Sequence, residues 1–232
     1  MFNVFPKKMI FSILCFDLDG TLIDHANKNS EAVKKLNKRI SEYKQRGAKI
    51  VYVSARNKAD TINAIDKYTL CNPNYLITDL GIHLYEFNER CKELKVNKAL
   101  KNDWDKKKID TLVTSINGVV SRKKLRSGPL KLTYYIDGGK NVIKNINRTL
   151  KSKKFDVSVF CSGNNSIYLI PKGYSKGKSL ELLIKNLSIN KRDVCVFGDS
   201  EADFSLYSKI RNSVLVGNAD PFVKKYTMKK IS

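Results

Sequence analysis

The chain has 232 residues, of which 42% are hydrophobic, and its formal net charge is +22. This apolar content excludes an intrinsically disordered chain, and the length allows one large domain or two small ones. The charge favours anionic partners such as nucleic acid, acidic membranes or phosphorylated small molecules. Because the basic residues are spread along the chain and aromatic residues do not alternate with them, we expect most of this charge to be solvated surface.

The cysteine and histidine content argues against disulfides and zinc. The five cysteines form no CxxC pair, and there are only two histidines. The apolar stretch 9–16 is short for a signal-peptide core and has no small-residue cleavage site. No run approaches the roughly 18 apolar residues that a membrane span needs. We therefore expect a soluble cytoplasmic protein without a membrane partner.

The first third of the chain alternates buried-strand and amphipathic-helix patterns. Apolar runs predict strands over residues 9–16, 48–56 and 74–81, and the spacing of apolar residues predicts helices over 29–46 and 58–70. This alternation with short connections is typical of right-handed βαβ units in a parallel sheet.

The middle of the chain has a different pattern, with strands that alternate apolar and polar residues. We expect, in chain order, a strand at 82–87, a Lys-rich helix at 97–116, a strand at 129–137, a helix at 140–153 and strands at 155–161 and 166–171. Such a sequence favours an α+β unit with one sheet face open.

The last part returns to the first style. The pattern predicts helices at 176–189 and 201–210 and strands at 193–200 and 213–219. The economical interpretation is one α/β domain, residues 1–82 and 169–232, interrupted by a smaller insert at residues 83–168.

Acidic residues gather where the predicted strands end. Asp17 and Asp19 lie two residues apart at such an end, so both side chains can face the same side. Ligands of open α/β sheets bind at the carboxyl ends of the strands. Other polar side chains at strand ends or helix starts could converge on the same edge: Ser54, Lys176, Asp199 and Asp203.

Carboxylates that lie so near one another repel unless a hard cation lies between them. A ligand set made only of oxygens suits Mg²⁺. Each residue alone has a plainer interpretation. A single Asp at a strand end is often a helix N-cap, and Ser54 can serve the same purpose. Lys176 is one of many surface lysines, and Lys178 competes with it for a site role. The order and context of these residues favour the functional interpretation.

Four motifs resemble those of the haloacid dehalogenase superfamily. They are "DLDGTL" at 17–22, the Ser of "VSAR" at 54, the Lys of "SKG" at 176 and "GDSEAD" at 198–203. The insert after the third predicted strand resembles a type-2 cap. The segments "PNYLITDLG", "KLTYYID" and "YLIPKGYSKGKSLELL" are similar to the sucrose-phosphate phosphatase and Cof-like branch, subclass IIB. The resemblance implies a Rossmann-like core with a parallel sheet and an inserted α+β cap.

The resemblance also implies roles for the acids that act on the substrate. Asp17 corresponds to the nucleophile that becomes an aspartyl phosphate. Asp19 corresponds to the general acid that protonates the leaving oxygen and then serves as base for the hydrolytic water.

The remaining motif residues correspond to groups that bind the phosphoryl group or the metal. Ser54 and Lys176 would hold the phosphoryl oxygens, and Lys176 is preferred to Lys178 because it directly precedes Gly177. Asp17, Asp199 and the main-chain carbonyl of Asp19 would ligate Mg²⁺. Asp203 would orient Lys176 or a metal-bound water.

The sequence departs from the family pattern at three places. Ser54-Ala55-Arg56 stands where Thr-Gly-Arg is common, and the hydroxyl is retained. Ala202 replaces a common Asn. The strand before "SKG" offers Ser166 and Tyr168 where acidic residues are expected in sucrose-phosphate phosphatases, which argues against sucrose phosphate as the substrate.

The sequence thus predicts a Mg²⁺-dependent phosphatase for a small phosphorylated metabolite, with a sugar phosphate favoured. Arg122, Arg126 and Lys131 are candidate readers of the leaving group, although surface charge explains them equally well. One alternative is a phosphosugar mutase of the same fold. A second is a non-catalytic basic protein that binds nucleic acid, a partner we do not expect despite the charge of +22, because it leaves the four motifs unexplained. Nothing in the sequence indicates an oligomeric state.

Overall fold

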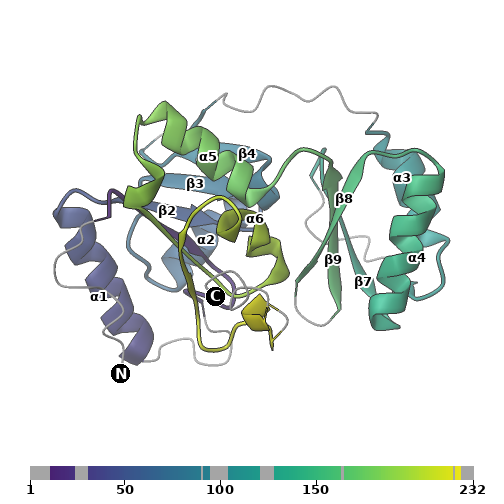
Figure 1. Ribbon diagram of the computed structural model, residues 1–232, viewed down its shortest axis with the longest axis horizontal. Coiled ribbons are helices and arrows are strands. Elements are labelled where there is room, and N and C mark those ends of the chain that lie inside the picture. The colour runs from purple at the N-terminus through teal and green to yellow at the C-terminus, as the bar shows by residue number, and fades with distance from the viewer. Residues whose placement is uncertain are drawn as a thin grey trace.

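A computed structural model describes residues 11–23, 31–89, 91–94, 104–120, 128–162, 165–221 and 223–225. Figure 1 shows two lobes, each built on its own β-sheet. We call the lobe with the seven-stranded sheet the larger lobe. The smaller lobe holds the four-stranded sheet and consists of the described residues from 104 to 171. Among the described residues, no helix combines the length and the apolar character that crossing a membrane requires.

The sheet of the larger lobe is mainly parallel, as the alternating sequence pattern predicts. Its strand order is β11-β10-β1-β2-β3-β4-β5, and the first five strands of that order pair in parallel. The strands are β1 Ile13–Asp17, β2 Lys49–Val53, β3 Tyr75–Thr78, β4 His83–Glu86, β5 Lys92–Glu93, β10 Val194–Gly198 and β11 Asn212–Leu215.

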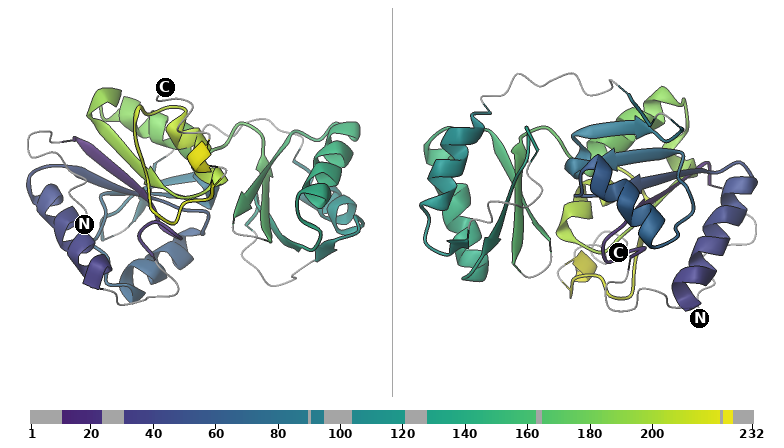
Figure 2. Two further views of the ribbon diagram at one scale, coloured as in Figure 1. Left: turned by 60° about the horizontal axis from the view of Figure 1, so that its bottom comes forward. Right: turned by 180° about the vertical axis from the view of Figure 1, so that it is seen from behind.

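Helices cover both faces of this sheet (Figure 2). One face packs on α1 (Glu31–Gln45) and α2 (Lys58–Lys67), and the other packs on α5 (Lys176–Asn186) and the short α6 (Phe204–Tyr207). Every residue of β1 is buried, because its side chains alternate between the two apolar clusters under these helices. Burial on both faces explains why the strand reads as a continuous apolar run.

The predicted start of the insert at residue 83 is wrong. Strand β4 pairs antiparallel with β3, and β5 continues the same sheet, so both belong to the larger lobe. The short 3₁₀ segment η1 (Asp79–Gly81) reverses the chain direction, and all three of its residues have positive φ. This turn returns the chain beside β3, where Leu84 and Tyr85 are buried in the core. The predicted end at 168 also lies inside a strand of the smaller sheet.

The smaller lobe is an antiparallel sheet with two helices on one face. Its strand order is β6-β7-β9-β8. Helices α3 and α4 lie on the side away from the larger lobe, so the opposite sheet face is turned toward that lobe (Figures 1 and 2). The bounds are β6 Val119–Val120, α3 Lys106–Thr114, β7 Leu132–Ile136, α4 Gly139–Ser152, β8 Val157–Ser162 and β9 Ser166–Pro171. The first residues of the predicted helix 97–116 lie outside the described residues.

The lobes meet through a small apolar cluster. The larger lobe contributes Leu80, Ile82 and Ala202, and the smaller lobe contributes Ile170 with the partly buried Phe160. Two further 3₁₀ segments, η2 (Lys191–Asp193) and η3 (Glu201–Asp203), flank β10, and η3 carries Ala202 into this contact. The carboxyl edge of the large sheet therefore faces the smaller lobe.

Candidate active site

Four predicted site residues come together at the carboxyl edge of the large sheet, namely Asp17, Lys176, Asp199 and Asp203. Asp17 is the last residue of β1, and Asp199 follows β10 directly. Lys176 begins α5, whose N-cap Ser175 accepts a hydrogen bond from the Lys178 backbone N–H. The parallel pairing of β1 with β10 places Asp17 and Asp199 at neighbouring strand ends.

A buried ammonium group links two of the acids. The Nζ of Lys176 donates to Asp17 Oδ1 at 2.6 Å and to Asp203 Oδ1 at 2.8 Å. The side chains of Lys176, Asp17 and Asp203 are only 3%, 5% and 0% exposed. Charged groups this deeply buried are stable only when paired and hydrogen-bonded. Lys176 therefore lies inside the acidic cluster, and its predicted role in binding the phosphoryl group stays a prediction.

The second oxygen of Asp203 fixes the loop after β10. Its Oδ2 accepts hydrogen bonds from the backbone N–H of Asp199 at 3.2 Å and of Ser200 at 3.1 Å, and also from the Ser200 hydroxyl. Asp203 thus orients Lys176 with one oxygen and positions Asp199 with the other. The sequence predicted the first contact and gave no sign of the second.

The cluster has more negative than positive charge. Asp17, Asp199 and Asp203 surround one ammonium group, and burial together with mutual repulsion raises the pKa of Asp17 well above its usual value. Burial and the Asp203 charge raise the pKa of Asp199 to about 6. Burial opposes the charge on Lys176, yet Asp17 and Asp203 together raise its pKa. The ammonium therefore stays protonated, and among the described residues Lys176 is the cation that pairs with these carboxylates.

The acidic cluster suits a divalent metal ion held through Asp17 and Asp199, because both oxygens of Asp203 already accept hydrogen bonds. Asp17, Asp199 and Asp203 each offer an oxygen, and these oxygens lie within 4.8 Å of one another. Among the described residues, the buried Asp199 Oδ1 has no hydrogen-bond partner. A buried carboxylate oxygen without a partner is costly, and an oxygen-ligated cation such as Mg²⁺ would satisfy it. The predicted contribution of the Asp19 carbonyl stays a prediction, because the side-chain cluster does not test it.

Two glycines allow the elements of the site to approach closely. Gly20 has φ of +85°, and a Cβ there would lie 2.2 Å from Asp199 Oδ2. A Cβ at Gly177 would lie 1.9 Å from the Ser205 carbonyl oxygen, where α5 packs against α6. A side chain at either position would push apart the segments that carry the acids and Lys176.

Asp19 is held outside the buried cluster by an arginine. Arg56 Nε donates to Asp19 Oδ2 at 2.8 Å and Arg56 Nη2 to Asp19 Oδ1 at 2.6 Å. These bonds raise the pKa of Arg56 and fix the plane of the carboxylate. In the sequence, Arg56 stands out only as the last residue of the Ser54-Ala55-Arg56 motif. Its signal was the position two residues after Ser54, at the end of the strand adjacent to β1.

Ser54 follows β2, beside the end of β1. Its backbone N–H donates to the Ile77 carbonyl at 2.8 Å, and its hydroxyl accepts from the Arg56 N–H at 3.1 Å. In the parallel register Asp17 pairs with Val53, so Ser54 lies one residue beyond the level of Asp17. The predicted phosphate-binding role of Ser54 stays a prediction.

A protein-family model, described as sucrose-6F-phosphate phosphohydrolase, matches residues 11–231. The chain belongs to this family. A probable sucrose-phosphatase 3b from Arabidopsis thaliana is 25% identical over 209 residues, which cover 88% of this chain and 48% of the relative. A mannosylfructose-phosphate phosphatase from Agrobacterium fabrum is 25% identical over 174 residues, covering 74% of this chain and 70% of the relative. The 232-residue chain itself spans about half the length of the first plant relatives that it matches.

Solved structures share the fold. The sucrose-phosphatase from Synechocystis, solved with sucrose and phosphate, has a TM-score of 0.79 and 21% identity, and the match covers 95% of this chain and 88% of that one. A haloacid dehalogenase-like hydrolase from Bacillus subtilis has a TM-score of 0.72 and 16% identity, covering 92% of each chain. The expected superfamily and its sucrose-phosphatase branch are confirmed.

Two residues at which the sequence departs from the family pattern, Ala202 and Tyr168, lie near the lobe junction. Ala202 is 3% exposed and packs in the apolar cluster between the lobes. Tyr168 is on the face of β9 opposite to Ile167 and Leu169, and it contacts the same cluster. An Asn at position 202 would place an amide in this apolar contact, so Ala suits the local packing.

Of the three candidate readers of the leaving group, Lys131 is the one that lies among the described residues. Arg122 and Arg126 lie outside the described residues. Lys131 is 1% exposed and binds groups of the larger lobe. It is therefore not a solvent-facing reader of a substrate, and its surroundings differ from both interpretations that the sequence suggested.

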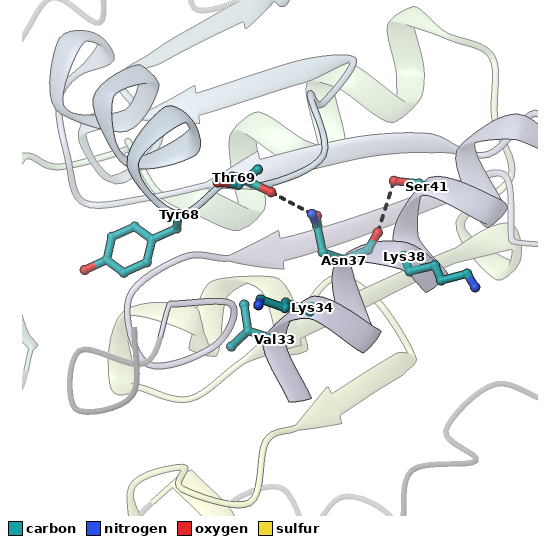
Figure 3. Close-up of a pocket in the computed structure, with 7 residues that line it drawn as sticks. All are labelled: Val33, Lys34, Asn37, Lys38, Ser41, Tyr68 and Thr69. Atoms are coloured by element: carbon teal, nitrogen blue, oxygen red, sulfur yellow. Dashed lines mark hydrogen bonds between the residues drawn. The ribbon is translucent and has the colours of Figure 1, made fainter. Parts of the chain in front are cut away.

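A surface pocket of about 400 Å³ lies apart from the acidic cluster, between α1 and the end of α2 (Figure 3). Asn37 Nδ2 donates across it to the Thr69 carbonyl at 2.7 Å, and the Ser41 hydroxyl donates to the Asn37 carbonyl. Its lining residues are Val33, Lys34, Asn37, Lys38, Ser41, Tyr68 and Thr69. These described lining residues include no carboxylate, imidazole or thiol, so they do not form a metal site.

Proposed function

We propose that this protein is a Mg²⁺-dependent phosphatase that hydrolyses a phosphorylated sugar through an aspartyl-phosphate intermediate. The observation that carries the proposal is the buried cluster in which Lys176 joins Asp17 to Asp203 beside Asp199. An excess of buried carboxylate that holds one fixed ammonium suits a metal ion and a phosphoryl group together. The family membership supports the same reaction.

In the first step, an oxygen of Asp17 attacks phosphorus and the bond to the sugar oxygen breaks. Lys176 fixes the Asp17 carboxylate through Oδ1, and its ammonium would stabilise negative charge on the phosphoryl oxygens. The Ser54 hydroxyl would donate to another of these oxygens. Holding the reacting groups in line supplies much of the rate enhancement in phosphoryl transfer.

Asp19 moves the proton in both steps. It protonates the departing sugar oxygen, and it then takes a proton from the water that attacks the aspartyl phosphate, which releases inorganic phosphate. Arg56 holds both oxygens of Asp19, so the carboxyl is oriented in advance. Before Asp19 can act as an acid, one oxygen has to carry a proton in place of an Arg56 hydrogen bond.

Mg²⁺ would be held by Asp17 and Asp199, with the Asp19 carbonyl as the expected third protein ligand. When bound, the ion supplies positive charge that offsets repulsion between the carboxylates and the phosphoryl group. The smaller lobe would act as the cap, covering this edge of the sheet and contacting the sugar. With β4 and β5 assigned to the larger lobe, the cap would comprise the described residues from Trp104 to Pro171.

A disaccharide phosphate is the first substrate class to test, since relatives carry the names sucrose-phosphatase and mannosylfructose-phosphate phosphatase. The neutral Ser166 and Tyr168 of β9, where acidic residues were expected, speak for a substrate other than sucrose phosphate itself.

The test is release of inorganic phosphate from a panel of disaccharide phosphates, hexose phosphates and nucleotides, with Mg²⁺ and with EDTA. We expect Mg²⁺-dependent release by the wild type and none by Asp17→Asn, with circular dichroism confirming that the variant is folded. Conversion of a sugar phosphate into its isomer would instead support the mutase. Salt-sensitive nucleic-acid binding without any turnover would support the non-catalytic alternative.

A further inference from the structure

The loop Ser54–Arg56 is fixed on its inner side by the turn after β3. The Leu80 N–H donates to the Ser54 carbonyl at 3.1 Å, and the Asp79 N–H donates to the Arg56 carbonyl at 2.8 Å. Both donors belong to η1, the segment with positive φ that reverses the chain. Two of the three carbonyls in the loop are therefore bound within the larger lobe.

The third carbonyl is bound by the smaller lobe. Lys131, directly before β7, donates from Nζ to the Ala55 carbonyl at 2.8 Å. The same ammonium forms an ion pair with the Asp79 carboxylate, and the Lys131 and Asp79 side chains are 1% and 9% exposed. The ammonium of Lys131, a residue of the smaller lobe, is thus buried against the larger lobe. It lies at Ala55, between Ser54 and Arg56.

The surroundings make this contact depend on how the lobes sit together. The neighbouring apolar cluster joins Leu80 and Ile82 to Ile170 and excludes water around the ion pair. Hydrogen bonds to a charged group in such a site are stronger than those at the surface. If the lobes separate, the Ala55 carbonyl loses its donor and the Asp79 carboxylate loses its cationic partner.

We propose that Lys131 is a positioning residue through which the seated smaller lobe fixes the phosphate-binding loop. It acts at Ala55, between Ser54, which would hold a phosphoryl oxygen, and Arg56, which holds Asp19. The inference rests on the proposed function of that loop. It follows that the phosphate site is complete only while the smaller lobe is packed against the larger lobe.

The first variant is Lys131→Met, which removes the ammonium and keeps most of the apolar stem. Because it leaves Asp79 buried without its partner, we expect a lower melting temperature. We also expect kcat/KM for p-nitrophenyl phosphate to fall about 10- to 100-fold, the range for loss of a charged hydrogen bond. The inhibition constant of inorganic phosphate should rise, because the loop that binds it is less fixed.

A double variant separates positioning from stability. Asp79→Asn combined with Lys131→Met removes the buried unpaired charge, and Asn tolerates the positive φ of 51° at this position. We expect the melting temperature to recover relative to Lys131→Met, while kcat/KM stays low because the Ala55 carbonyl still lacks its donor.

Lys106→Met is the matched control. Lys106 Nζ donates at 2.8 Å to the Gly128 carbonyl, so both partners belong to the smaller lobe. Its removal should leave kcat/KM and phosphate inhibition within about twofold of the wild type. The indole N–H of Trp104, the single tryptophan, donates to the Pro129 carbonyl, so its fluorescence reports whether the segment before Lys131 keeps its structure.

The outcomes are distinct. Recovery of both stability and turnover in the double variant, or equal behaviour of Lys131→Met and Lys106→Met, overturns the inference. Absence of turnover and of phosphate binding in the wild type refutes the proposed function instead. Low turnover in both Lys131 variants, with recovered stability in the double variant and an unaffected Lys106→Met, supports the positioning role.

Discussion

The carboxyl edge of the large sheet and the junction between the lobes each bury a lysine against aspartate. At the sheet edge, Lys176 meets Asp17 and Asp203 near Asp199, so carboxylates outnumber the ammonium. At the junction, Lys131 meets one carboxylate, that of Asp79, and the charges balance. The comparison teaches that burial of a charged pair alone does not mark a reactive site. The unbalanced charge and the unpaired oxygen do.

The largest effect on activity is expected at Lys176. Lys176→Met removes the ammonium from the acidic cluster, and we expect phosphate release to fall about 10²- to 10³-fold, as for loss of a donor to a transition-state charge. The matched control is Lys178→Met, two residues later in the same helix, which should retain activity. Equal losses in the two variants, measured on the best substrate of the panel, would contradict the assignment of Lys176.

The metal requirement tests the unpaired oxygen at the sheet edge. In Asp199→Ala the oxygen that lacks a hydrogen-bond partner is gone, so we expect the Mg²⁺ concentration for half-maximal activity to rise at least about tenfold. A Mg²⁺ titration of activity measures this change. Lys131→Met serves as the comparison, since the described residues of the junction pair one carboxylate with one ammonium, and its Mg²⁺ requirement should be unchanged. An unchanged requirement in Asp199→Ala would place the metal elsewhere.

The pH dependence of stability distinguishes the two regions without substrate. The pKa of Asp199 is raised from 3.8 to about 6 in the folded protein, so the folded state binds more protons than the unfolded state between these values. Without Mg²⁺, the free energy of unfolding should therefore fall as pH rises from about 4 through 6. Allowing for the partial exposure of Asp199, its contribution is of the order of 1 to 2 kcal/mol.

Urea unfolding in EDTA across this pH range measures the fall. Asp199→Asn should make the fall smaller without abolishing it, because the raised pKa of Asp17 contributes with the same sign. Saturating Mg²⁺ should also reduce the fall by binding the ionised carboxylates. If the variant and the wild type have parallel pH profiles, the raised pKa of Asp199 is not the cause.

The smallest effect is expected at the exposed pair Lys172–Asp156, whose Nζ and Oδ1 lie 3.4 Å apart. Both side chains are about two-thirds exposed, so Lys172→Ala should change the free energy of unfolding by no more than about 0.5 kcal/mol. Thermal unfolding beside Lys131→Met gives a surface baseline for the buried junction pair. A loss as large as that of Lys131→Met would contradict the importance of burial.

The sequence was sufficient to predict the helices and strands whose apolar residues follow a simple periodic pattern. Strands β1, β2, β3 and β10 are buried on both faces and read as apolar runs, and α5 and α2 have apolar faces and caps that mark where they begin. The motif residues at their ends follow from the parallel topology, which brings Asp17 and Asp199 to one edge.

Other features depend on contacts that no local pattern encodes. The antiparallel return of β4 depends on positive φ at Asp79 and Leu80, which are residues that rarely indicate such a turn. The two-residue strands β5 and β6 are too short for a periodic signal. The burial of Lys131 depends on the lobe contact, because its own segment offers a lysine among many.

Strand order has a consequence for how the chain is made. In the sheet, β1 lies between β2 and β10, and Ile13 pairs with both Lys49 and Val194. During synthesis β1 can therefore acquire one neighbour early, while its other edge stays open until β10 leaves the ribosome. An unpaired apolar edge is the part of a sheet most prone to aggregation. The smaller lobe is contiguous in sequence and is synthesised within that interval. A nascent chain would therefore present a folded insert beside an unfinished large sheet. The acidic edge of the large sheet would form last.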